Sequence, residues 1–153
     1  MTDEHVRPGS GKSATMESQQ KRSPLDPVLA PVSIGELIDK IVILEIKAAR
    51  VTDPARLVEV TKELNLLNQI GYGTAETRHE IKSLKQELRE VNETLWDIED
   101  RIRDCERREN FGPDFIQLAR AVYITNDRRA ALKRRINEVS GSAIREIKAH
   151  PSY

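Results

Sequence analysis

The stretch from Ile81 to Cys105, IKSLKQELREVNETLWDIEDRIRDC, decides the fold class of this chain. Its apolar residues are separated by three and four positions in strict alternation, which is the a/d pattern of a coiled coil. These residues are Ile81, Leu84, Leu88, Val91, Leu95, Ile98, Ile102 and Cys105. Such a seam must be buried against another helix, so the sequence predicts a protein built from packed helices.

The composition favours long, charged helices in a single domain. The chain has 153 residues, of which 33% are charged and only 4% are aromatic. Its 25 basic and 25 acidic side chains balance, so no net charge attracts the whole molecule to nucleic acid or to an anionic membrane. A single cysteine, no signal-like apolar segment near the start and no run approaching the roughly 20 apolar residues of a membrane span predict a cytoplasmic protein without membrane contact.

Three regions are expected along the chain. Residues 1–32 are rich in Ser, Gly, Pro and Gln without periodicity, which predicts a disordered tail. Residues 33–140 are expected to form a helical domain, and residues 141–153 a short helix over 143–149 with a C-terminal tail.

Four helices are expected within the domain. The first begins after a capping box, Ser33-Ile34-Gly35-Glu36, in which the serine hydroxyl accepts from a backbone amide and the glutamate reaches back. Its apolar residues cover well over half of its circumference, so it is expected to be the central element. The expected ranges are 34–50, 54–70, 75–110 and 113–140, with Asp53 as the cap of the second and Gly141 as the stop of the fourth.

Short turns between these helices predict an all-α fold: an antiparallel four-helix, coiled-coil-like bundle of two αα-hairpins behind the disordered tail. The first two helices are only about 27 Å long, whereas the third and fourth are about 50 and 40 Å long. The shorter pair can therefore cover roughly half of the longer pair. The remaining apolar seam predicts a homodimer, or contact with another helical protein.

A polar groove between the third and fourth helices is the predicted site. Thr125 and Arg129 interrupt the apolar seam of the fourth helix, opposite the stretch Val91–Leu95. In this groove Trp96 offers a stacking plane, and the cations can hold a phosphate or a carboxylate. The candidate ligand-binding residues are Asn92, Trp96, Glu99, Arg103, Tyr123, Asn126, Arg129 and Lys133.

Several interpretations of this groove stay open at the level of sequence. It can be a solvated face stitched by ion pairs with Lys133 exposed, a small-anion or nucleotide-sugar site, or a protein-contacting surface. Nucleic-acid binding is not favoured, because the basic run from Arg128 to Arg135 is spread around its helix. No catalytic residue, cofactor or metal site is predicted, since His5, His79 and His150 lack partners at ligand spacing.

Four strings of the sequence resemble a bacterial family of unknown function. They are SIGELIDKIVILEIK at 33–47, LWDIED at 95–100, FIQLAR at 115–120 and NDRRAALK at 126–133. The resemblance covers about residues 33–140 and implies a small helical domain, in some members attached to sugar-transferring or repeat-containing proteins. It implies no activity for any residue.

The leading functional expectation is a non-catalytic helical interaction or assembly module, because every strong pattern concerns helix packing. The alternative is a small-anion or nucleotide-sugar-binding domain, or an enzyme, that uses the groove between the third and fourth helices.

Overall fold

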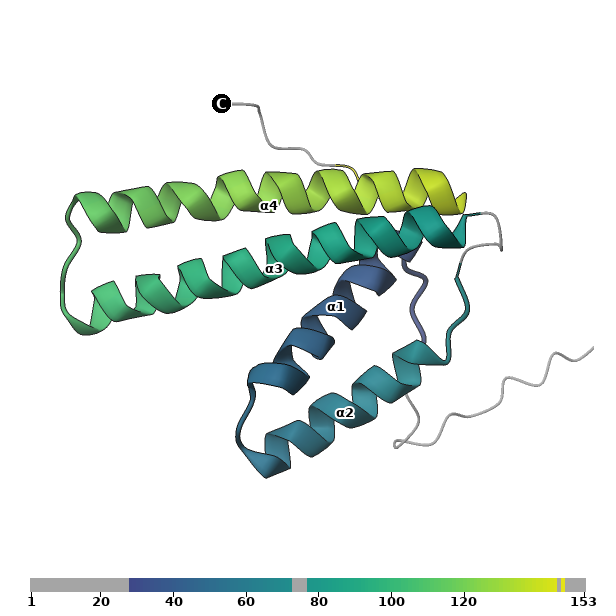
Figure 1. Cartoon of the computed structure of the whole chain (residues 1–153), viewed down its shortest axis with the longest axis horizontal. Helices are drawn as coiled ribbons and strands as arrows, with labels where there is room; N and C mark the ends of the chain where they lie inside the picture. The colour runs from purple at the N-terminus through teal and green to yellow at the C-terminus, as the bar shows by residue number, and fades with distance from the viewer. Residues whose placement is uncertain (1–27, 73–76, 146, 148–153) are drawn as a thin grey trace, which may run out of the picture. The chain divides into compact units, whose positions relative to one another are not determined.

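A computed structural model describes residues 28–72, 77–145 and 147 of the chain. These described residues form four α-helices and no strand (Figure 1): α1 is Ile34–Arg50, α2 is Pro54–Asn68, α3 is Arg78–Arg107 and α4 is Pro113–Ser140. The helices pair as two antiparallel hairpins, α1 with α2 and α3 with α4. The predicted all-α fold is therefore confirmed. The predicted disordered tail lies largely outside the described residues, and residues 28–32 lie outside any helix.

The helix ends follow from local hydrogen bonding. Ser33 begins α1, because its hydroxyl accepts from the Glu36 amide at 3.2 Å. Asp53 begins α2 in the same way, accepting from the Ala55 amide at 2.9 Å ahead of a proline in the first turn. Gly141 ends α4 with a φ of 64°, a left-handed conformation that glycine adopts without strain.

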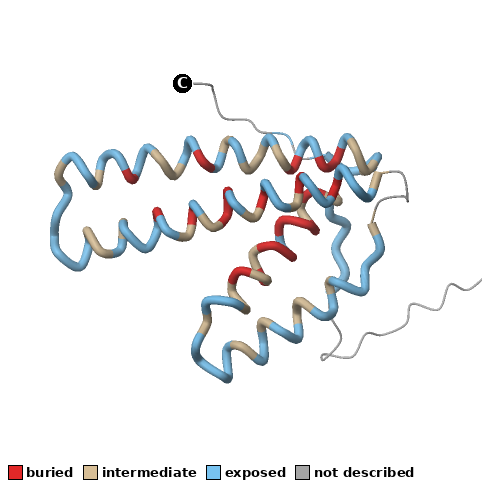
Figure 2. Tube along the Cα trace, in the orientation of Figure 1, coloured by how far each residue is buried: buried red, intermediate tan, exposed pale blue. Residues whose placement is uncertain are grey.

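α1 is the central element, as predicted, because it contacts α2, α3 and α4. Its side chains Ile38, Val42 and Ile46 form the core with residues of the α3–α4 hairpin. Those hairpin residues are Ile81, Leu84, Leu88 and Ile136. Figure 2 shows the buried positions gathered where α1 crosses the hairpin, whereas the part of the hairpin toward its turn is mostly exposed or intermediate.

The predicted apolar seam of α3 is largely buried. Six of the eight predicted positions of α3 are buried, while Ile102 and Cys105, closest to the turn, are only half-buried. On α4 the buried seam positions are Leu118, Thr125 and Ile136. Although α3 and α4 are long, no helix in the described part of the chain is apolar enough to cross a bilayer.

α2 is held less firmly than the other helices. Among the described helices it contacts only α1, and none of its described residues is buried. One face of α2 is half-buried, whereas Val58 and Leu66 on other faces are 63% and 47% exposed. The half-buried residues, spaced three and four positions apart, are Leu57, Val60, Leu64 and Leu67.

The predicted short helix over 143–149 is wrong for the residues that the structure describes there. Residues 143–145 and 147 are not helical, and the other three lie outside the described part. The Ser142 hydroxyl accepts from the Ile34 amide at 3.2 Å and donates to the Ile144 carbonyl at 2.9 Å, which ties this segment to the start of α1. So short a helix is also intrinsically marginal.

Helices α2 and α3 are likewise shorter than predicted, ending at Asn68 and Arg107.

Gly35 sits where α1 meets α4, and a side chain there has no room. A Cβ atom at Gly35 would collide with the Lys133 carbonyl oxygen and would lie 2.9 Å from Asn137 Oδ1. We expect Gly35→Ala to lower the free energy of unfolding by about 1–3 kcal/mol, because the two helices must move apart. Urea denaturation followed by circular dichroism measures this change.

Gly71→Ala is the matched control, because no heavy atom lies within 4 Å of a Cβ at that position. We expect that substitution to change the stability by less than about 0.5 kcal/mol. Equal effects of the two substitutions would contradict the close contact between α1 and α4.

Candidate functional site

The polar residues that were predicted to line a groove between α3 and α4 meet α1 in the half of the hairpin that lies away from its turn. Four polar residues along α3 and α4 contact α1 rather than solvent: Asn92, Arg129, Lys133 and Asn137. The half of the hairpin nearer the turn is covered less by α1 and α2 than the other half. We call it the open half of the hairpin; it comprises residues 96–107 of α3 and 113–126 of α4.

Asp39 of α1 is the centre of the covered half. Its side chain is 1% exposed and accepts a hydrogen bond from Asn92 Nδ2 at 2.9 Å. Arg129 donates to both of its carboxylate oxygens, from Nε at 3.0 Å and from Nη2 at 2.5 Å. A two-pronged guanidinium–carboxylate contact of this kind fixes orientation as well as distance. Arg129 is therefore engaged by the protein's own carboxylate.

Two further contacts hold the first turn of α1 to α4. Lys133 Nζ lies 2.5 Å from Glu36 Oε2, and the Lys133 side chain is only 10% exposed. Asn137 Oδ1 accepts from the Gly35 amide at 2.6 Å. The interpretation of Lys133 as an exposed groove residue is thus wrong, because α1 covers it. The Glu36 carboxylate pairs with Lys133. The second hydrogen bond of the predicted capping box, from the Ser33 amide to the Glu36 carboxylate, is therefore not formed among the described residues.

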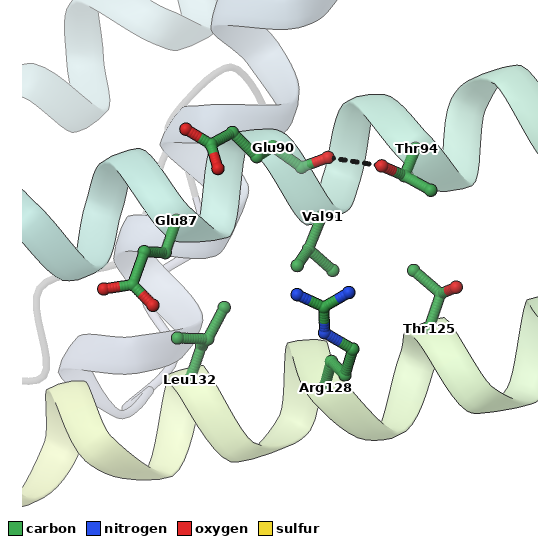
Figure 3. Close-up of a pocket in the computed structure, with 7 residues that line it drawn as sticks. All are labelled: Glu87, Glu90, Val91, Thr94, Thr125, Arg128 and Leu132. Atoms are coloured by element: carbon green, nitrogen blue, oxygen red, sulfur yellow. Dashed lines mark hydrogen bonds between the residues drawn. The ribbon is translucent and has the colours of Figure 1, made fainter.

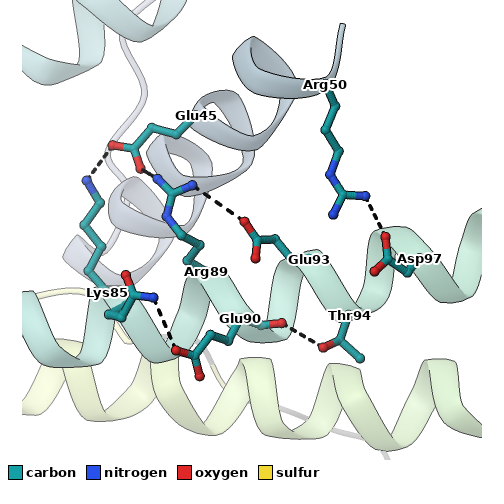
Figure 4. A network of polar contacts seen from close by, with 9 residues as sticks. Glu45, Arg50, Lys85, Arg89, Glu90, Glu93, Thr94 and Asp97 are labelled. Atoms are coloured by element: carbon teal, nitrogen blue, oxygen red, sulfur yellow. Dashed lines mark hydrogen bonds and ion pairs between the residues drawn. The ribbon is translucent and has the colours of Figure 1, made fainter.

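A second charged contact joins α1 to α3. Figure 4 shows the Glu45 carboxylate of α1 lying between Lys85, at 2.6 Å, and Arg89. All three side chains are partly buried. Carboxylates of α1 thus meet cations of the hairpin at Glu36, Asp39 and Glu45, which is an electrostatically complementary interface.

A cavity of about 420 Å³ opens where α1 diverges from the hairpin. It brings together five of the eight predicted site residues: Asn92, Trp96, Glu99, Arg103 and Arg129. Ile43 and Ile46 of α1 and Leu95 of α3 form its apolar wall. The cations at its rim are matched by carboxylates, because Arg103 lies 3.1 Å from Glu99 and 3.8 Å from Asp100.

Arg50, at the end of α1, covers Trp96 of α3. Its guanidinium carbon lies 5.6 Å from the centre of the indole ring, within the range of a cation–π contact. It also donates to Asp97 Oδ1 at 2.6 Å (Figure 4), and this hydrogen bond raises the pKa of Arg50 above its ordinary value. Arg50 thus occupies part of the Trp96 ring face that was predicted to stack on a ligand.

The structure does not bring the remaining predicted residues into the cavity. Tyr123 and Asn126 lie on exposed positions of α4 in the open half, and Lys133 is buried beneath α1. Among the described residues, no group of three or more His, Cys, Asp or Glu side chains is placed to hold a metal ion.

A second cavity of about 420 Å³ lies between α3 and α4 and contains none of the predicted site residues. Figure 3 shows Arg128 of α4 extending toward Val91, with Glu87 and Glu90 of α3 and two threonines around it. One of those threonines is Thr125, which the sequence identified as a break in the α4 seam. The seam interruption therefore borders this cavity.

Sequence reasoning missed Asp39 as the partner of Arg129. The available pattern was an acidic residue in the middle of an otherwise apolar face of α1, since Asp39 lies between Ile38 and Ile41. A charge at such a position is buried only when it is paired. Gly35 stands one helical turn before Asp39, where α1 lies closest against α4 and a side chain has no room.

Comparison with known families supports the resemblance noted in the sequence. Residues 29–152 match a family of unknown function, DUF6165. The chain belongs to this family. DUF6165 is a family of unknown function, so membership assigns no role to any residue of the chain. No curated protein and no solved structure matches the chain.

The Asp39–Arg129 contact is expected to stabilise the folded state of this DUF6165 member. We expect Asp39→Asn to lower the free energy of unfolding by about 3 kcal/mol, because it removes the charge of the buried carboxylate that the Arg129 guanidinium binds through two donors. Chemical denaturation monitored by circular dichroism gives this value.

Asp100→Asn is the matched control, because Asp100 is an exposed carboxylate that lies 3.8 Å from Arg103. We expect it to cost less than about 0.5 kcal/mol. A loss for Asp39→Asn no larger than that of the control would show that the buried contact does not hold α1.

Proposed function

We propose that this chain is a non-catalytic helical module that assembles with a second copy of itself through the open half of the hairpin. The observation that carries the proposal is a set of large apolar side chains exposed around that half. Phe111 is 50% exposed, Ile116 56%, Tyr123 41% and Ile124 41%. Exposed apolar side chains gathered on one part of a surface are typical of protein contacts.

The charges of the groove support an assembly role over ligand capture. Arg129 is paired with Asp39 and Lys133 with Glu36, and both contacts are partly buried where α1 meets α4. A small anion in this groove would have to compete with a carboxylate at each of these cations. The alternative, a small-anion or nucleotide-sugar site, rests on the cavity beside Trp96. We place the module in the cytoplasm, because its single cysteine fits a reducing compartment.

Self-association is the direct test of the proposal. We expect sedimentation velocity to show a reversible monomer–dimer equilibrium in the micromolar range. Ile116→Asp should weaken it at least about tenfold, because it places an unpaired charge in the contact. Ile70→Asp is the matched control, since Ile70 is 47% exposed but lies after α2, outside the hairpin. A monomer at all concentrations would refute the proposed assembly.

Trp96 fluorescence separates the module from the alternative. We expect nucleotide sugars and sugar phosphates to leave both the Trp96 emission and the thermal unfolding temperature unchanged, since Arg129, the most enclosed cation of the cavity, is already held by Asp39. A saturable quench that Arg103→Gln abolishes would favour the ligand-binding alternative.

A further inference from the structure

Charge is distributed unevenly along the open half of α3. Between residues 96 and 100 there are three acidic residues and no basic one: Asp97, Glu99 and Asp100. Between residues 101 and 108 there are four arginines and two acidic residues: Arg101, Arg103, Arg107, Arg108, Asp104 and Glu106. The end beside the cavity is thus acidic, and the end beside the turn is basic.

On one face of α3 the charge of the side chains changes from negative to positive between the cavity and the turn. Trp96, Asp100, Arg103 and Arg107 follow one another at spacings of four, three and four, so they share a face of the helix. Trp96, Asp100 and Arg103 line the cavity, and Arg107 continues the face toward the turn. The ion pairs that these residues make within α3, such as Arg107 with Asp104 at 2.6 Å, are exposed and contribute little stability, so they can be exchanged for contacts with a partner.

The arginines at the turn end of α3 act on Asp104. A hydrogen bond from Arg107, and then the charge of Arg108, hold the pKa of Asp104 below its ordinary value. Nearer Trp96, the charged residues of α3 that line the cavity before Arg103 are the carboxylates Glu99 and Asp100. Two copies laid side by side in parallel would place like charges together, whereas an antiparallel pair would place acidic on basic at both ends.

The positions of an exposed aromatic side chain and of the cavity favour the same antiparallel arrangement. Phe111 lies in the turn that follows α3, after Arg107, whereas Trp96 lies at the other end of this surface. In an antiparallel pair the turn of each copy lies toward the cavity end of the other, so Phe111 is brought toward Trp96 and the apolar wall of the partner's cavity. Phe111 is half exposed and packs edge-on against Phe115 at 5.3 Å, so it already projects as a supported aromatic group.

We propose that two copies pair antiparallel about a two-fold axis, with the Arg103–Arg107 end of each α3 on the Glu99–Asp100 end of the other and Phe111 in the partner's cavity. This inference rests on the proposed function and specifies the partner as a second copy of the chain and the contact as this surface. The contact is isologous: each copy contributes one cavity and one aromatic group, so a single dimer satisfies both and closes the assembly.

Charge reversal in two complementary variants tests the arrangement. One variant carries Arg103→Glu and Arg107→Glu, which makes both ends of its α3 surface acidic. The other carries Glu99→Lys and Asp100→Lys, which makes both ends basic. We expect the dimer dissociation constant of each variant alone to rise at least about tenfold, because like charges then meet twice.

An equimolar mixture of the two variants should restore association. In the mixed dimer the acidic end of one copy meets the basic end of the other at both contacts, so its dissociation constant should return to within about threefold of the wild type. Native mass spectrometry identifies the mixed dimer by its mass, and sedimentation equilibrium gives its affinity.

The control variant carries Arg78→Glu and Lys82→Glu, which reverse two exposed charges at the same i, i+4 spacing at the start of α3. It should leave the dimer unchanged, because this end of α3 lies outside the open half. Circular dichroism of each variant verifies its helix content.

A variant without any charge change provides an independent measurement. Phe111→Ser lies in the turn and should weaken the dimer about tenfold by removing the aromatic group from the partner's cavity. In the wild type, dilution through the dimer–monomer transition should shift the Trp96 emission to longer wavelength as the cavity is exposed to water.

The outcomes distinguish this inference from the proposed function. If the wild type dimerises but the mixture is no tighter than its components, the antiparallel contact is wrong while the assembly proposal stands. Trp96 emission that stays constant through dissociation would also overturn the contact. A wild type that stays monomeric would overturn both proposals together.

Discussion

The docking of α1 on the α3–α4 hairpin is the contact on which the rest of the structure depends. It combines an apolar ridge, a glycine at the closest approach and three carboxylates that meet cations of the hairpin. The apolar part supplies most of the favourable free energy, since burial of such side chains contributes about 1.5–3 kcal/mol each. The charged part is specific in position, because a buried carboxylate is tolerated only where its partner lies.

That specificity defines how far along the hairpin α1 can sit. A seam of repeated apolar residues is permissive, because a slide by one heptad replaces one aliphatic side chain with another. Asp39 removes this freedom, since Arg129 and Asn92 together offer hydrogen-bond donors at one level of the groove. Polar residues that interrupt a helical seam are known to select a register in this way. The cavity and the open half of the hairpin exist where they do because α1 stops where it does.

The helices could be predicted from the sequence far better than the site. Local patterns predicted the approximate bounds of α1 and α4, because capping by Ser33 and the left-handed Gly141 depend on neighbours in the chain. The polar stripes of α3 and α4 were also predicted to face one groove, which helical periodicity implies. What fills that groove depends on tertiary packing, and no periodicity shows that Lys133 lies under α1 or that Arg50 covers Trp96. The three-residue contact at Asp39 likewise joins segments about 50 and 90 positions apart in the chain.

The way α2 is attached has a consequence for how the molecule opens. Because α2 packs on α1 alone among the described helices and none of its described residues is buried, its separation exposes little apolar surface. Local opening of such an element costs much less free energy than global unfolding. The backbone amides of α2 should therefore exchange with solvent deuterium through brief detachments that leave α1 seated on the hairpin, whereas the amides around Ile38, Leu88 and Ile136 exchange only when the whole core comes apart.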